Sequence, residues 1–165
     1  MKHSVENKLP RPNLTSPIHF FAFGFGSGLS PKAPGTVGTL ASIPIFYFIS
    51  DFSLFHYLIV ISVVIISGIV ICDLSSKDLK VHDHPGIVLD EFAGFFVTMI
   101  AVPVSWTNVI AGFVLFRLFD IWKPWPINWL DQKVSGGFGI MIDDILAGIF
   151  AASILHLLLN YGVLK

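Results

Sequence analysis

Apolar runs separated by short polar turns dominate the chain, and their lengths indicate membrane helices. Residues 54–72 carry no formal charge and have about the 20 residues that a bilayer core of roughly 30 Å requires. The run is rich in Ile and Val, but a lone strand cannot satisfy its backbone in lipid, so we predict a helix. Residues 18–25 are too short to span and are expected to lie in the membrane interface. Shorter runs predict four further helices, at residues 36–50, 92–104, 108–122 and 141–160.

The composition strengthens the membrane interpretation. The 165 residues are the size of one domain, and only 13% of them are charged, about half the usual fraction of roughly 25%. With 54% hydrophobic residues, a soluble chain this short could not bury its apolar side chains. We therefore predict an all-α fold, a compact polytopic membrane bundle of about five short transmembrane or interfacial helices. Residues 1–17 are predicted to be a polar lead-in without the apolar core of a signal peptide, and residues 18–165 a single helical domain.

Charge is small overall but unevenly distributed over this predicted topology. The net charge of −1 gives no indication of a nucleic-acid partner, and the single cysteine, Cys72, excludes an internal disulfide. With the N-terminus inside, the inner loops are residues 26–35, 73–91 and 117–140, whereas the outer turns contain Asp51 and no basic residue. The positive-inside rule then orients the bundle and places its charged and glycine-rich features on the inner face. Those loops hold six basic residues: Lys32, Lys77, Lys80, Arg117, Lys123 and Lys133.

Two acidic motifs resemble each other, D-E-F-A-G at residues 90–94 and D-D-I-L-A-G at residues 143–148. Asp90 and Asp144 each precede a glycine by four residues, so acid and glycine share a helix face, and the glycine permits close approach of another backbone or a head group. Helix capping is one explanation, because acids are favoured in a first turn. One acid would suffice for a cap, however, and ionisable groups at membrane depth are expected to be functional.

The segment F-R-L-F-D-I-W-K-P-W-P-I, residues 116–127, adds both signs of charge to the same face. Arg117 and Asp120 are three residues apart, so simple pairing is the alternative to a functional role. The tryptophans that follow suit interfacial anchoring. Because hard oxygen ligands hold Mg²⁺, the acids also predict a magnesium site beside a phosphate. The candidate ligands are Asp83, Asp90, Glu91, Asp120, Asp143 and Asp144.

Elimination narrows the predicted chemistry. The loop at residues 25–40 gathers glycines, prolines and hydroxyls around Lys32, but lacks the G-x-x-x-x-G-K-[ST] spacing of a nucleotide P-loop. His82 and His84 flank a candidate ligand, although a solvated loop is the simpler interpretation for them. The chain also shows no pattern for a cysteine, aspartyl-phosphate or histidine nucleophile. The mechanism that remains is attack of metal-activated water on a phosphoryl group, with cations holding the phosphoryl oxygens.

Four motifs in order resemble the bacterial phosphatidylglycerophosphatase A family over roughly residues 20–160. They are GSGLSPKAPGTVGTL, DEFAG, FRLFDIWKPWPI and GGFGIMIDDILAG. The resemblance implies a Mg²⁺-dependent enzyme of the bacterial inner membrane, with its site facing the cytoplasm, that hydrolyses phosphatidylglycerophosphate to phosphatidylglycerol and phosphate. The residues that it carries over are Lys32, Thr36, Asp90, Glu91, Arg117, Asp120, Lys123, Asp143 and Asp144.

The predicted roles follow from charge and type. Lys32, with Thr36 in its loop, would hold the terminal phosphate, and Arg117 or Lys123 the diester phosphate. Asp90 or Asp144 would deprotonate water, a choice that sequence leaves open. These two acids, together with Glu91, Asp120 and Asp143, are the predicted metal ligands. A small membrane transporter or channel component is the alternative function, since intramembrane acids and glycine-interrupted helices also suit ion coupling.

Overall fold

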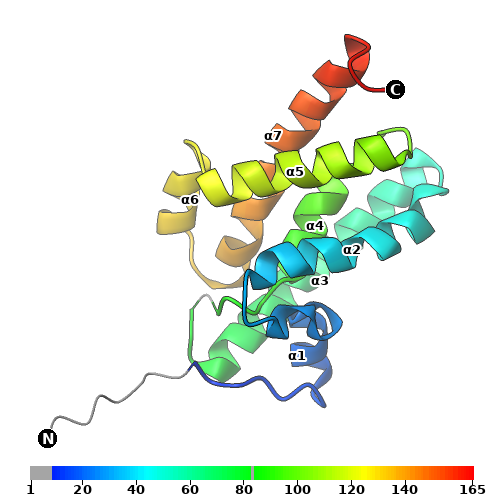
Figure 1. Cartoon of the computed structure of the whole chain (residues 1–165). Coiled ribbons are helices and arrows are strands. Elements are labelled where there is room, and N and C mark those ends of the chain that lie inside the picture. The colour runs from blue at the N-terminus through cyan, green and yellow to red at the C-terminus, as the bar shows by residue number, and fades with distance from the viewer. Residues whose placement is uncertain (1–8, 83) are drawn as a thin grey trace, which may run out of the picture.

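The computed structural model describes residues 9–82 and 84–165, and every regular element in these ranges is helical. Five longer helices correspond to the five predicted from sequence, and three short helices accompany them (Figure 1). The elements are α1 (Pro17–Ala22), the 3-10 helix η1 (Gly24–Leu29), α2 (Pro34–Ser50), α3 (Leu54–Leu79), α4 (Leu89–Thr98), α5 (Trp106–Trp122), α6 (Ile127–Lys133) and α7 (Gly136–Asn160).

Helix α4 is the centre of the bundle, with α2, α3, α5 and α7 packed around it. Nine of its ten residues are buried. Phe92, Phe95 and Phe96 are each at most 2% exposed, and burial of a large apolar side chain contributes about 1.5–3 kcal/mol. A ten-residue helix covers only about 15 Å, which is half of a bilayer core. Helix α4 is therefore too short to cross a bilayer by itself and lies within the bundle.

Glycines allow α4 and α7 to cross with their backbones in contact. A Cβ at Gly94 would lie 2.7 Å from the carbonyl oxygen of Asp144, and a Cβ at Gly148 would overlap the carbonyl oxygen of Gly94. Each glycine stands one turn after an acid, at Asp90 and Asp144. The close approach predicted for the two acid-glycine motifs is therefore confirmed, and the motifs meet each other.

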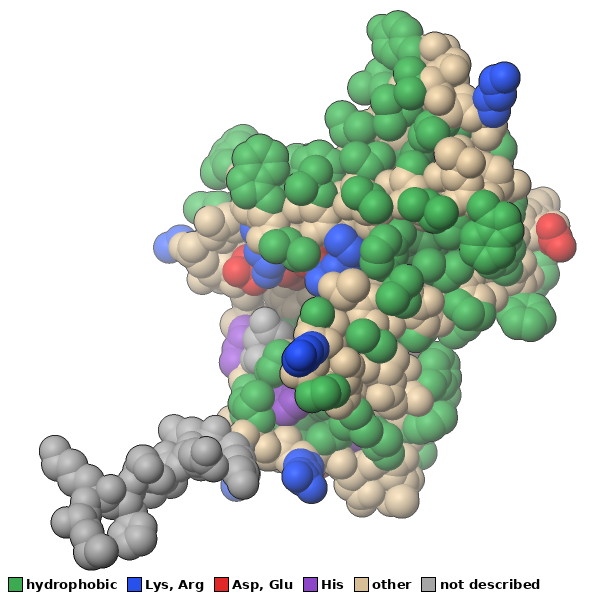
Figure 2. All heavy atoms as spheres, in the orientation of Figure 1, with side chains coloured by type: hydrophobic (Ala, Val, Ile, Leu, Met, Phe, Trp, Pro, Cys, Tyr) green, Lys and Arg blue, Asp and Glu red, His purple; other side chains and the backbone are tan. Residues whose placement is uncertain are grey.

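Two helices, α3 and α7, are long and apolar enough to cross a membrane by length and composition. Along α3, exposed apolar side chains recur every three or four residues, at Phe55, Ile59, Val63, Ile66 and Val70. Apolar side chains also cover much of the visible surface of the bundle (Figure 2). An unpaired apolar helix face of this kind is expected when lipid is the surrounding solvent.

Three predicted boundaries were wrong. The helix predicted at residues 54–72 continues to Leu79, because its polar last turns are joined by an ion pair between Asp73 and Lys77. The helix predicted at residues 92–104 is α4, which starts and ends earlier and includes both acids of the first motif. Residues 117–140, predicted as an inner loop, contain the short helix α6.

The start of α7 also differs from the prediction, which had a glycine turn before a helix at residue 141. Ser135 is the N-cap, and the helix begins at Gly136, whose positive φ of 74° a glycine adopts readily. Gly137 packs directly on the backbone of Ile69 in α3. The two glycines therefore form the first turn of α7, and Gly137 contacts α3. Because α7 begins earlier than predicted, the second acid pair lies in its interior and not in its first turn.

One end of the bundle collects the charged segments (Figure 1). The starts of α2, α4 and α7 and the ends of α3 and α5 lie on the left of the view, whereas the α2–α3 and α4–α5 turns lie on the right. The structure thus brings both acidic motifs and the α5 end to a common side, as the charge map predicts.

Candidate active site

Five carboxylates from three helices meet at this end of the bundle. Asp90 and Glu91 lie in the first turn of α4, Asp120 near the end of α5, and Asp143 and Asp144 in the third turn of α7. Two overlapping triplets each place three carboxylate oxygens within 4.8 Å of one another. The first triplet is Asp90, Glu91 and Asp144, and the second is Asp120, Asp143 and Asp144. All five predicted metal ligands are thus neighbours.

The carboxylates are buried beyond what a helix cap requires. Asp143 and Asp144 are 7% and 3% exposed and are the eighth and ninth residues of α7, so they cannot cap it. In the described part of the chain, Oε2 of Glu91, Oδ1 of Asp143 and Oδ2 of Asp144 are buried without a hydrogen-bond partner. Buried charges are normally paired or coordinate a metal. A donor set made only of carboxylate oxygens fits a hard cation such as Mg²⁺.

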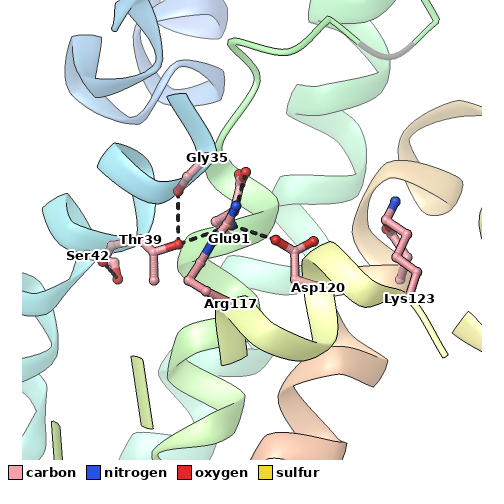
Figure 3. Close-up of polar contacts among 8 residues, drawn as sticks. Gly35, Thr39, Ser42, Glu91, Arg117, Asp120 and Lys123 are labelled. Atoms are coloured by element: carbon pink, nitrogen blue, oxygen red, sulfur yellow. Dashed lines mark hydrogen bonds and ion pairs between the residues drawn. The ribbon is translucent and has the colours of Figure 1, made fainter. Parts of the chain in front are cut away.

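Arg117 of α5 joins three elements (Figure 3). Its Nη1 lies 2.6 Å from Oδ2 of Asp120 and 3.7 Å from Oε1 of Glu91. The same nitrogen donates to Oγ1 of Thr39 over 3.4 Å, and that hydroxyl donates to the carbonyl of Gly35 at 2.9 Å. The pairing of Arg117 with Asp120 that the sequence left as an alternative is therefore present, and the guanidinium also reaches α4 and α2.

Lys123, the C-cap of α5, provides the second cation. Its Nζ donates to Oδ2 of Asp143 at 2.7 Å and to Oδ1 of Asp131 at 2.9 Å. Burial alone would lower the pKa of Lys123, but the two carboxylates outweigh burial and hold that pKa above its usual range. Lys123 therefore carries its charge throughout the neutral pH range.

A polar hollow of about 230 Å³ opens beside the acids. Figure 2 shows acidic and basic side chains together in a depression edged by apolar ones. Its walls come from α4, α6, α7 and the segment after α3, so a ligand there would contact both acidic motifs. The residues that line it are His82, Asp90, Asp131, Val134, Gly139, Ile140 and Asp143.

The loop around Lys32 reaches the site through another residue. Lys32 is exposed in the turn before α2, and within the described ranges no hydrogen bond or ion pair joins it to the carboxylates. Thr36, predicted as the first residue of a helix, lies in the first turn of α2 and is half-buried. Gly35 instead lies against Glu91 and Arg117, where an added Cβ would overlap Oε1 of Glu91. The catalytic and phosphate-binding roles of Lys32 and Thr36 stay predictions.

Sequence reasoning missed Thr39, the α2 residue that contacts Arg117. Its only sequence signal is its position, three residues after Thr36 on the same helix face.

The histidines near the site have structural partners. The backbone N–H of Gly136 donates to Nε2 of His82 at 3.2 Å, which helps to cap α7. His84 accepts from the N–H of Gly86 at 3.0 Å, so its Nε2 carries the proton and donates to the carbonyl of Pro10 at 3.1 Å. The remaining candidate ligand between them, Asp83, lies outside the described residues.

Comparison with known proteins identifies the family. The model of the family described as Phosphatidylglycerophosphatase A matches residues 20–159. The chain belongs to the phosphatidylglycerophosphatase A family. Its members include phosphatidylglycerophosphatase A of Escherichia coli (strain K12), which is 50% identical over 147 residues, or 88% of this chain and 86% of the relative.

Two further relatives cover most of the chain. Phosphatidylglycerophosphatase A of Haemophilus influenzae is 46% identical over 147 residues, 88% of this chain and 90% of the relative. A Bacteroides thetaiotaomicron protein with a provisional name as a phosphatidylinositol-3-phosphatase is 36% identical over 135 residues, 78% of this chain and 84% of the relative. No solved structure matches the chain significantly.

Proposed function

We propose that this protein is a Mg²⁺-dependent phosphatase that hydrolyses phosphatidylglycerophosphate to phosphatidylglycerol and phosphate. The family membership and the names of two relatives supply the reaction. The observation that carries the proposal is the meeting of five carboxylates and two basic side chains at one end of an apolar bundle. Such a site suits an anionic head group whose lipid part stays in an apolar environment.

Mg²⁺ would be held by Asp90, Glu91, Asp120, Asp143 and Asp144, the carboxylates of the two triplets. When bound, Mg²⁺ activates water and neutralises charge on phosphoryl oxygens. The buried oxygens without hydrogen-bond partners support this assignment, because a cation would satisfy them.

The basic side chains would bind and orient the substrate. Arg117 is fixed by Asp120, Glu91 and Thr39, so little side-chain entropy is lost when its remaining N–H groups bind a phosphate oxygen. Lys123 forms an ion pair with a different carboxylate of the cluster, Asp143. Either cation would bind the diester phosphate, and Asp90 or Asp144 would accept the proton of the attacking water.

We further propose that the bundle is a multi-pass protein of the bacterial inner membrane with the site facing the cytoplasm. The exposed apolar face of α3 and the basic residues at the site end support this orientation. Single cysteines at Lys133 and Ser135 should react with a membrane-impermeant thiol reagent only in inverted vesicles, and those at Ser53 and Thr107 only in intact cells. All four positions are exposed. Labelling of both pairs from one side would refute the orientation.

The reaction is tested by phosphate release from phosphatidylglycerophosphate by purified protein in detergent. EDTA should abolish release and added Mg²⁺ should restore it. Asp90→Asn and Asp144→Asn should each reduce turnover by at least about 100-fold, while Asp51→Asn, at the opposite end of the bundle, should not. Phosphatidylinositol 3-phosphate serves as the competing substrate suggested by the third relative. Folded protein that releases no phosphate from either lipid would refute the proposal and favour the transporter alternative.

A further inference from the structure

The two acidic triplets share one residue, Asp144. Its side chain is 3% exposed, and its Oδ2 has no hydrogen-bond partner among the described residues. The two oxygens of one carboxylate can bind two cations at once, and paired metal ions about 3.5–4 Å apart recur in enzymes of phosphoryl chemistry. Asp144 is therefore the residue that a pair of cations at the two triplets would share.

Each triplet also contains an acid whose two oxygens differ in their surroundings. In the first triplet, Oε1 of Glu91 faces Arg117 at 3.7 Å, whereas Oε2 is buried without a hydrogen bond. In the second, Oδ2 of Asp143 accepts from Lys123 at 2.7 Å, whereas Oδ1 is buried without a hydrogen bond. One oxygen of each acid thus faces a basic side chain, and the other is left for a cation.

The charge balance of the site also favours two cations over one. The five carboxylates exceed Arg117 and Lys123 by three negative charges, and the substrate adds a phosphate dianion. One divalent cation would leave a substantial negative charge on a buried site holding a dianion, which low dielectric makes costly. Two divalent cations reduce the excess for these groups to one negative charge.

We propose that the site binds two divalent cations, one at Asp90 and Glu91 and one at Asp120 and Asp143, with Asp144 as the bridging ligand. The inference rests on the metal dependence in the proposed function and specifies its stoichiometry. Mn²⁺ is a suitable probe, because it accepts the same oxygen ligands as Mg²⁺ and is paramagnetic.

The test is a Mn²⁺ titration of metal-depleted, full-length protein in detergent, followed by electron paramagnetic resonance at low temperature. We expect two Mn²⁺ per chain and a spectrum with exchange coupling, because a shared carboxylate couples neighbouring ions. Saturation at one Mn²⁺ per chain, or two ions without coupling, would overturn the inference.

Variants separate the two sites. Glu91→Gln and Asp120→Asn should each retain one uncoupled Mn²⁺, since each removes a ligand from only one triplet. Asp144→Asn should lose the coupling, and Asp131→Asn, which contacts Lys123 but belongs to neither triplet, should keep two coupled ions. Retained coupling in folded Asp144→Asn, or its loss in Asp131→Asn, contradicts the bridge. If Asp144→Asn does not fold, two ions in both single-site variants refute the assignment.

Phosphate release measured on the same samples separates this inference from the proposed function. Normal hydrolysis with one Mn²⁺ per chain would overturn the two-ion site and leave the phosphatase assignment intact. Two coupled ions without hydrolysis of either lipid would support the two-ion site and refute the phosphatase assignment.

Discussion

The crossing of α4 and α7 determines how far apart the two acidic motifs lie, so a single methyl group at the crossing should impair catalysis. In Gly94→Ala, the new Cβ would lie 2.7 Å from the carbonyl oxygen of Asp144 and 2.5 Å from Cε2 of Phe116. Ordinary contacts begin at 3.4 Å, so α7 must retreat by about 0.7 Å at that point. Asp144 belongs to the displaced turn and moves with it.

The effects on stability and on activity should differ in size. Replacing a helical glycine by alanine gains about 1 kcal/mol in helix propensity, whereas overpacking costs about 1–3 kcal/mol. The net change in unfolding free energy is therefore small, about 0–2 kcal/mol of destabilisation. Displacement of a catalytic group by about 1 Å costs roughly 100-fold in rate. We expect kcat to fall by about 10- to 100-fold in Gly94→Ala, and similarly in Gly148→Ala, which meets the backbone of Gly94.

The assay is phosphate release from phosphatidylglycerophosphate well below the Tm of each variant, with Tm measured in the same detergent. Gly112→Ala is the matched control, because it also adds a methyl group to a helical glycine. Its Cβ would meet first the flexible sulfur of Met99, which can move. Full kcat in both Gly94→Ala and Gly148→Ala would refute the argument that the crossing positions the acids.

Substitutions at three other positions test contacts beside the cluster and, at His19, a contact away from it. Gly35→Ala should lower kcat by about 10-fold with little change in Tm, because the new Cβ displaces Glu91; unchanged kinetics would show that this contact is unimportant. Lys123→Met should impair turnover more than Lys123→Arg, which keeps a positive charge beside Asp143; equal losses would exclude a role for charge. His19→Ala should cost about 2 kcal/mol, or roughly 4–8 °C in Tm, because this buried ring bonds to α3 at both nitrogens. Its kcat should be normal, and a selective loss of activity would contradict a purely structural role.

The sequence was sufficient to predict the helical bundle and the two acidic motifs, because both depend on local patterns of residues. A long apolar run has few alternatives in lipid. The repeated spacing of acid and glycine predicted close approach of another backbone or a head group. The structure places a backbone there, with Gly94 against Asp144. Four motifs in order also predicted the family, which the comparisons confirm.

The remaining features depend on tertiary contacts that local patterns do not encode. Thr39 belongs to the site only because α2 lies beside α5, and nothing in its own segment indicates Arg117. The early start of α7 was missed because glycine disfavours helices locally, whereas packing of Gly137 on α3 overrides that preference. Lys32 was selected for its glycine-rich neighbours, yet the glycine that touches the cluster is Gly35.

The carboxylate cluster should destabilise the bundle until cations bind it. Buried charges without compensation cost several kcal/mol, and Asp144 is almost inaccessible to water. Divalent cations should therefore raise the Tm, and a concentration about 100-fold above Kd adds about 2.7 kcal/mol. For a chain of this size that corresponds to about 5–10 °C.

Asp144→Asn makes this argument testable, because it removes a buried charge and keeps the shape of the side chain. Without metal, the variant should have a higher Tm than the native protein, since the repulsion among the acids is smaller. With 10 mM Mg²⁺ it should gain much less than the native protein, so the order of the two Tm values should reverse. Thermal unfolding in EDTA and in Mg²⁺, with Asp51→Asn as the control acid far from the cluster, measures both shifts. A lower Tm for Asp144→Asn in EDTA would mean that this carboxylate stabilises the fold, and its burial would then be structural and unrelated to function.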